Sequence, residues 1–135
     1  MSADGSLLFV ANTGDDRILR LDLKTKEIGV FAESLNGVDG IAYYRGKLIV
    51  AENQGDRVLI VDDSGRVIAK LGDFLGIRND GSPRGLLFPA SLVIVDDELF
   101  VTNLALPLTM TAGDEPEEKV TRYTISKIAI PKDLP

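Results

Sequence analysis

The sequence predicts an all-β fold of propeller blades, because one strand pattern recurs along it. Ser6–Asp22 and Lys47–Asp62 each contain two apolar runs joined by a tight polar turn, which indicates a pair of antiparallel strands. A third copy begins at Glu98, with an offset of 51 residues from the second. Antiparallel units that repeat every 40 to 50 residues or so are typical of propeller blades, whereas a β-sandwich or a meander does not explain a constant offset. Four residue pairs of the first two copies match at an offset of 40 residues: Ala11 and Ala51, Asp16 and Asp56, Arg17 and Arg57, and Asp22 and Asp62.

The expected strands follow the chain in units of four, named A to D in order. The first repeat lacks A, and its B, C and D are expected at Leu7–Thr13, Arg17–Leu23 and Glu27–Ala32. The second repeat is complete, with strands at Gly40–Tyr44, Lys47–Asn53, Arg57–Asp62 and Arg66–Leu71. The third has strands at Ala90–Val95, Glu98–Asn103 and Val120–Ile125, with a short D at Ile128–Ile130. No segment keeps a helical period, and helix is expected only as one turn near Asp73–Gly76.

The repeat count predicts an incomplete ring. Residues 1–135 are expected to form one partial propeller domain, with blade repeats at about 1–36, 37–84 and 85–135. Propellers close with about four to eight blades, and three blades would leave the apolar faces of the end blades in water. We therefore expect a homodimer that closes a six-bladed ring, with strand exchange supplying the missing A.

Composition excludes several kinds of chemistry. The chain has no cysteine and no histidine, which removes disulfides, zinc–sulfur sites, Ser–His–Asp triads and histidine-ligated metals. A net charge of −6 argues against a nucleic-acid or anionic-membrane partner. Catalysis would depend on carboxylates, amides, hydroxyls, Lys, Arg or an oxygen-ligated cation.

The N-terminus has no basic segment followed by an apolar run, so no signal peptide is expected and the chain as given would be cytoplasmic. The segment after Met1 resembles a turn between two strands of a repeat already under way. This pattern predicts a fragment or a truncated copy of a longer protein, and a full-length parent could be exported.

The connections predict which face carries a site. In an up-and-down blade the A–B and C–D turns share one face, and here all of them are short. The long connections are Gly72–Pro89 and Leu104–Lys119, and both fall on the opposite face. Loops longer than about 12 residues are usually functional or disordered, so we place any site there. The polar residues that this face offers at strand ends are Asn12, Asp39, Glu52, Asn53 and Asn103.

Asp39 is the strongest of these candidates, because it stands just before a predicted inner strand, where it could point into the central channel. Carboxylate and amide oxygens at such a mouth suit a hard cation such as calcium. Asp39 could instead bond its own backbone in the turn Val38-Asp39-Gly40. For Asn12, Glu52 and Asn103, which occupy equivalent positions, the alternative is that each simply ends a strand.

The run GSLLFVANTGDDRILRLDLKTKEI, followed by VDGIAYYRGKLIVAENQGDRVLIVDDSGRVI, resembles NHL-type repeats of six-bladed propellers. More narrowly, it resembles the senescence-marker-protein/gluconolactonase (regucalcin-like) family, as does the ending FPASLVIVDDELFVTNLALPL with KVTRYTISKI. The resemblance covers only the C-terminal half of that family.

This resemblance implies a calcium- or zinc-dependent lactonase or esterase, with a Glu, an Asn and an Asp holding one divalent ion at the channel mouth. Asp39 matches the family's Asp, which comes from a D-G pair opening a strand A. The Glu and the Asn belong to blades that precede this chain. At the equivalent position of the third repeat stands Ala90, which cannot bind a metal.

Three further segments have less specific patterns. Arg78-Asn79-Asp80-Gly81 is similar to a substrate-binding R-x-N-D-G motif of the family's first half, but it lacks one residue and is interpreted as a turn, with Asn79 kept as a ligand-face candidate. The acidic run Asp114–Glu118 lacks EF-hand spacing. The apolar stretch Leu104–Met110 could form a lid or, as we favour, a subunit contact.

Two functions remain open from the sequence. One is a divalent-metal-dependent hydrolase of lactones or esters, in which the ion polarises the carbonyl and activates water. The other is a non-catalytic propeller scaffold that binds a ligand or a protein on its long-loop face.

Overall fold

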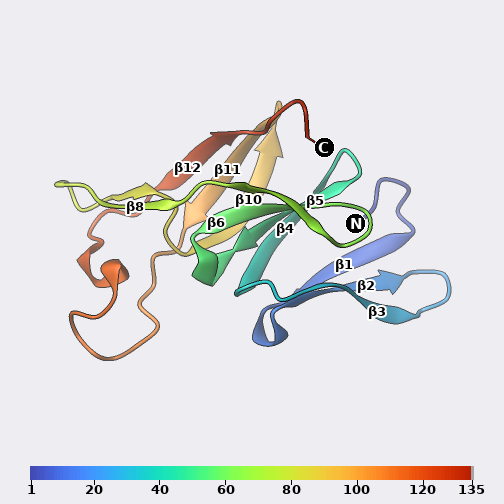
Figure 1. The fold of residues 1–135 in the computed structure, drawn as a ribbon, viewed down its shortest axis with the longest axis horizontal. Helices are drawn as coiled ribbons and strands as arrows, with labels where there is room; N and C mark the ends of the chain where they lie inside the picture. The colour runs from blue at the N-terminus through green and yellow to red at the C-terminus, as the bar shows by residue number, and fades with distance from the viewer. Residues whose placement is uncertain (135) are drawn as a thin grey trace.

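Residues 1–134 are described by a computed structural model, in which antiparallel sheets follow one another along the chain (Figure 1). Blade 1 is the sheet of β1 (Leu7–Asn12), β2 (Arg17–Asp22) and β3 (Ile28–Glu33). Blade 2 contains β4 (Val38–Tyr44), β5 (Lys47–Glu52), β6 (Arg57–Val61) and β7 (Val67–Leu71). Blade 3 contains β10 (Pro89–Val95), β11 (Glu98–Asn103) and β12 (Ile125–Ala129). The remaining elements are the hairpin β8 (Phe74–Ile77) and β9 (Pro83–Gly85), and the 3-10 turns η1 (Thr13–Asp15), η2 (Asn53–Gly55) and η3 (Pro116–Lys119).

The predicted all-β blade architecture is confirmed. Blade 1 has the strands expected as B, C and D, and blade 2 has all four in the order β4-β5-β6-β7. The turns Arg45-Gly46 and Asp96-Asp97 join strands A and B with two residues, all of positive φ, as two-residue hairpins require. Within residues 1–134, no helix is long and apolar enough to cross a membrane.

The third blade differs from the prediction. Strand C was expected at Val120–Ile125, but β12 pairs with β11 over Ile125–Ala129, and no separate strand D forms at Ile128–Ile130. In this register Ile128 and Ile130 pack into the core between blades 2 and 3. Val120 is instead buried beneath the β8–β9 hairpin. Because Val120 is buried under the hairpin and Ile128 and Ile130 are buried between the blades, the strand that pairs with β11 begins five residues later than predicted.

The long connection after blade 2 also differs from the prediction. The helical turn expected near Asp73–Gly76 is instead β8, which pairs with β9. Gly76 has a φ of +102°, which is incompatible with a helix. Phe74 and Ile77 of β8 pack on Val120, so the two long connections lie together, as the shared loop face requires.

Blade 2 is buried on both faces, which explains its nearly continuous apolar strands. Leu48 and Val50 of β5 pack against blade 1, whereas Ile49 packs against blade 3. All three are at most 2% exposed. The core is therefore two layers, one on either side of blade 2.

Candidate functional site

Asp39 lies in an irregularity at the start of inner strand β4. The pairing of β4 with β5 shifts between Val38 and Ile41, and the pairing of β10 with β11 shifts at the equivalent place. Such bulges redirect side chains and often occur beside functional sites. Asp39 is partly buried, and its side chain forms no hydrogen bond to its own backbone among the described residues. The local turn interpretation therefore has no support in the geometry.

Gly40 is explained by packing. A Cβ atom at this position would lie 2.4 Å from the carbonyl oxygen of Ala90, because β4 and β10 approach closely there. Only glycine fits such a backbone contact. Packing therefore explains the glycine of the Asp39-Gly40 pair, and only Asp39 remains to be explained by binding.

Glu52 is buried, and both oxygens of its carboxylate have bonding partners. Its Oε1 accepts a hydrogen bond of 2.9 Å from the backbone N–H of Asn36, and its Oε2 forms an ion pair with Arg57. Glu52 as a whole residue is 3% exposed. Glu52 thus holds the connection into β4 in place.

Asn103 occupies the equivalent position in blade 3 and has the same role. Its Oδ1 accepts a hydrogen bond of 2.9 Å from the backbone N–H of Leu87, the position equivalent to Asn36. Its Nδ2 donates to the hydroxyls of Thr124 and Ser126, at 3.0 and 2.9 Å. No side-chain polar atom buried within residues 1–134 lacks a partner, so Asn103 is satisfied by the fold.

Asn53 joins two blades. Its Nδ2 donates a hydrogen bond of 3.1 Å to the carbonyl oxygen of Pro89, the first residue of β10. Thr13, at the equivalent position of blade 1, donates a hydrogen bond of 2.6 Å to the carbonyl oxygen of Val38, the first residue of β4. Each blade therefore holds the start of the next inner strand.

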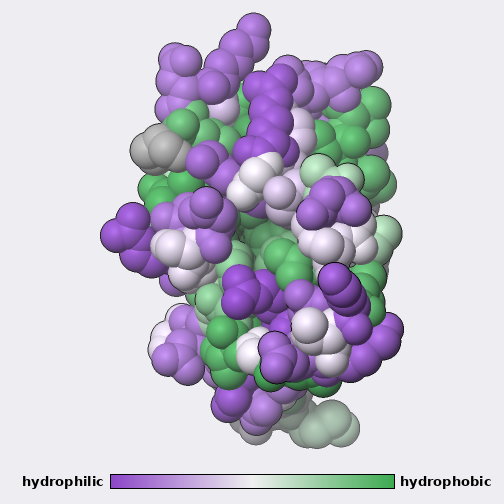
Figure 2. Space-filling view, turned by 90° about the vertical axis from the view of Figure 1, so that its right-hand side faces the viewer, coloured by the Kyte–Doolittle hydropathy of each residue, from purple (hydrophilic) through white to green (hydrophobic). Residues whose placement is uncertain are grey.

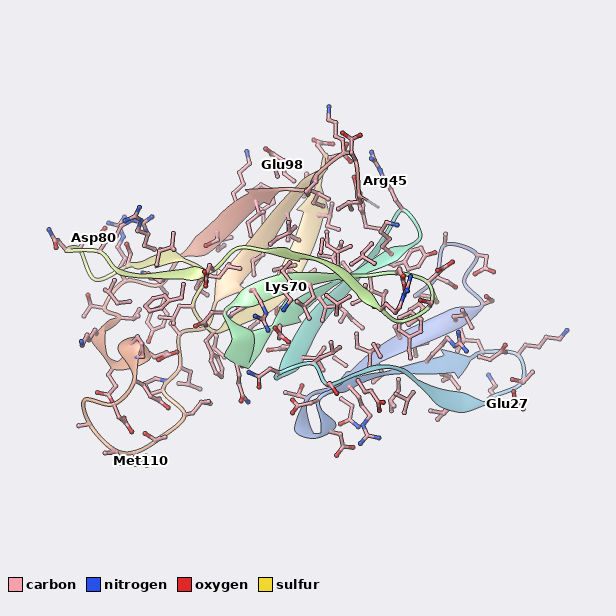
Figure 3. All side chains as sticks on the ribbon, in the orientation of Figure 1. Glu27, Arg45, Lys70, Asp80, Glu98 and Met110 are labelled. Atoms are coloured by element: carbon pink, nitrogen blue, oxygen red, sulfur yellow. The ribbon has the colours of Figure 1, made fainter. Side chains whose placement is uncertain are left out.

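Asn12 and Asn79 do not reach the inner strands. The Nδ2 of Asn12 donates to Asp15 at 2.9 Å, within its own turn. Asn79 is exposed in the turn between β8 and β9, beside Asp80, which Figure 3 shows at the far end of this hairpin. The turn interpretation of Arg78–Gly81 agrees with a backbone hydrogen bond of 2.9 Å from Gly81 to Arg78.

Sequence reasoning missed the residues that cap the blade junctions. Oδ1 of Asp16 accepts a hydrogen bond of 2.8 Å from the N–H of Gly37, and Oδ1 of Asp56 accepts one of 2.7 Å from the N–H of Phe88. Both aspartates have a left-handed backbone conformation, with φ of 52° and 53°. Burial raises the pKa of the Asp56 carboxyl, against the lowering effect of the Phe88 N–H. The offset of 40 residues that pairs Asp16 with Asp56 was the signal that could have identified them.

The acidic run Asp114–Glu118 stabilises its own loop. The Glu115 carboxylate accepts a hydrogen bond of 2.5 Å from the N–H of Leu108, and Asp114 accepts one of 3.0 Å from the Thr109 hydroxyl. Glu118 accepts the N–H of Gly113. These bonds fold the loop back on itself and leave its apolar tip in solvent, as Figure 3 shows at Met110.

The described candidates do not fit a calcium or zinc site. Calcium takes about six to eight oxygens, but Oε1 of Glu52 and Oδ1 of Asn103 already accept backbone hydrogen bonds at the junctions, and Oε2 of Glu52 pairs with Arg57. Within residues 1–134, no group of three or more Asp and Glu side chains is placed to hold a metal ion. A groove of about 380 Å³ runs between β12 and the β8–β9 hairpin, and none of the candidates lines it. Asp39 and the exposed Asn79 are the two candidates whose side chains form no hydrogen bond among these residues, and of the two only Asp39 lies on an inner strand.

No protein-family model matches the chain, and no curated protein is significantly similar to it in sequence. Its fold is similar to that of a luciferin-regenerating enzyme, with a TM-score of 0.70 and 17% identity over 95% of this chain and 42% of that one. It is also similar to a streptogramin B lyase, with a TM-score of 0.57 and 15% identity over 96% of this chain and 39% of that one. The chain thus spans about two fifths of the length of these structures. Identities this low establish a shared fold, that of part of a β-propeller.

Proposed function

We propose that this chain is a β-propeller segment that acts as a binding scaffold, and that a single copy is not by itself a metal-dependent hydrolase. One observation carries the proposal: the oxygen atoms Oε1 of Glu52 and Oδ1 of Asn103 already accept backbone hydrogen bonds at the blade junctions. Replacing these bonds with metal bonds would leave buried backbone groups unpaired, at a cost of about 1–3 kcal/mol each.

The long-loop face supplies the binding surface for this scaffold. Leu106, Leu108 and Met110 are 54%, 59% and 103% exposed. Their loop is held by its own acidic side chains, so little ordering entropy remains to be lost on binding. An apolar tip on an ordered loop is the kind of surface that marks a contact with a ligand or a protein.

A second candidate is a lactonase or esterase of the gluconolactonase-like type. Asp39 supports it, because it lies in the pairing irregularity at the start of inner strand β4 and its side chain forms no hydrogen bond among residues 1–134. The two similar structures are both enzymes, a luciferin-regenerating enzyme and a streptogramin B lyase. In this alternative the chain supplies Asp39 as one ligand, and further blades supply the rest.

Metal titration tests whether a single copy of the chain holds an ion at Asp39. Calcium and zinc are titrated by calorimetry into the chain, into Asp39→Ala, and into Asp63→Ala, which removes an exposed carboxylate in the turn between β6 and β7. The scaffold predicts no saturable binding in any of them and no turnover of lactone or ester substrates. Saturable binding that is lost in Asp39→Ala and kept in Asp63→Ala would establish the Asp39 metal site and overturn the scaffold proposal.

A further inference from the structure

Blade 1 has one apolar face that no other part of the described chain covers. The strand register aligns two rows across this face: Leu8, Leu21 and Ile28, and Val10, Leu19 and Val30. Four of these six side chains are between 36% and 67% exposed: Leu8, Val10, Ile28 and Val30. We call these two rows the leading face. Figure 2, viewed from the right-hand side of Figure 1, shows that hydrophobic surface also lies between polar side chains on the neighbouring side of the molecule.

The repeat identifies what the leading face is built to contact. With the offset of 40 residues, Leu8 and Val10 are equivalent to Leu48 and Val50 of blade 2. Those two residues are 2% and 0% exposed, because they pack on blade 1. The leading face of a blade is therefore the face that the preceding blade covers.

Blade 3 exposes the opposite kind of face, which we call the trailing face. It includes Val93, Val95 and Ile125, at 55%, 50% and 66% exposed, and the partly buried Phe100. Phe100 is equivalent to Ile49, which is fully buried against the following blade.

Charged groups on the trailing face are already neutralised. Lys127 pairs with Glu98 at 2.7 Å, and its ammonium lies 5.8 Å from the centre of the Phe100 ring. Covering this face therefore leaves no isolated charge from this pair.

We propose that a second copy of this chain covers both faces, with the trailing face of each copy packed on the leading face of the other. The contact repeats the packing seen twice within the chain, between blades 1 and 2 and between blades 2 and 3. Two such head-to-tail contacts close a dimer with twofold symmetry. The proposal rests on the sheet faces alone and is independent of the binding scaffold and of Asp39.

Sedimentation velocity over a range of concentrations tests the contact. The wild-type chain is expected at twice its 14.6 kDa mass. Val10→Lys on the leading face and Ile125→Lys on the trailing face should each give folded monomers, with circular dichroism as the check on folding. Leu75→Lys, at a 59% exposed position on β8, is the matched control and should stay dimeric. A wild-type monomer at every concentration, or a dimer that survives both face variants, would overturn the proposal.

A mixing experiment tests the head-to-tail direction. Val10→Lys keeps its trailing face, and Ile125→Lys keeps its leading face, so an equimolar mixture should form a one-to-one complex that neither variant forms alone. That complex retains one of the two contacts and should be weaker than the wild-type dimer. If Ile125→Lys remains dimeric while Val10→Lys does not, two leading faces pack together and the head-to-tail contact is wrong. Open polymers of the wild type would likewise contradict the closed dimer.

Discussion

Asp56 shows how a single carboxylate holds two blades together. It is partly buried, takes a left-handed backbone conformation, and accepts the N–H of Phe88 at the entry to β10. Burial raises its pKa above the ordinary value of 3.8, because the charged form loses hydration there. Asp16 makes the same contact at the junction between blades 1 and 2.

Two substitutions of Asp56 should separate the contribution of its hydrogen bond to stability from the contribution of its charge. Asp56→Ala leaves the Phe88 N–H without its acceptor and places alanine at positive φ, so the free energy of unfolding should fall by about 1–3 kcal/mol. Asp56→Asn keeps an acceptor and tolerates the left-handed conformation, so its loss should be smaller. Urea unfolding of the three proteins measures the difference, and equal losses in both variants would contradict this role.

The same variants predict a pH dependence. Because the pKa of Asp56 is raised in the folded protein, protonation of its carboxyl stabilises the fold. This stabilisation is complete below pH 3.8, the pKa in the unfolded chain, and it is lost as the pH rises through the folded pKa. The wild type should therefore lose stability relative to Asp56→Asn over that window. A constant difference between the two proteins would mean that the Asp56 carboxyl is not perturbed by burial.

At the scale of elements, the inner strands β4 and β10 are held close together. Each carries a pairing irregularity near its start, and they meet at Gly40 and Ala90. The approach is possible because Gly40 has no side chain. Asp39 lies in the same irregularity. Its position therefore also depends on the close approach of the two strands that Gly40 allows.

Adding one methyl group at Gly40 should disturb this contact. Gly40→Ala would bring a Cβ to 2.4 Å from the Ala90 oxygen, and forcing the strands apart should cost about 1–3 kcal/mol. Gly29→Ala, in β3, meets no atom within 4 Å and should change stability by less than about 0.5 kcal/mol. Thermal or urea unfolding compares the two, and a Gly40→Ala protein as stable as Gly29→Ala would show that the strands separate freely.

At the scale of the whole molecule, blade 2 is the centre of stability. Its strands β5 and β6 are paired on both edges and buried on both faces. Within one copy, blades 1 and 3 each bury one face, and their last strands, β3 and β12, pair on one side only among residues 1–134. Local opening is easiest where few apolar contacts oppose it.

Hydrogen exchange should follow this arrangement. Backbone amides of β5 and β6 should exchange most slowly, near the rate set by global unfolding, and those of β3 and β12 should exchange faster. Mass spectrometry of peptides from each blade measures the order. Equal protection in β12 and β6 would contradict a molecule organised around blade 2.

Local pattern was enough for most of the strands. Leu7–Asn12, Lys47–Glu52 and Glu98–Asn103 form where apolar runs and flanking turn residues predicted them, within a residue at either end. The prediction was wrong where two apolar segments compete for one position, as at Val120 and Ile128. Which of them enters the sheet depends on the β8–β9 hairpin, a contact distant in sequence.

The sequence by itself determined the all-β class, the blade repeat and its count, and the absence of cysteine and histidine chemistry. These follow from residue identity and spacing, which are local properties. Tertiary structure decided the roles of the polar strand ends, because whether Glu52 or Asn103 is available to a ligand depends on backbone groups brought beside it by the next blade. It also distinguished Asp39 from them. The physical reason is that a carboxylate or an amide looks the same in a sequence whether its hydrogen bonds are already used or not.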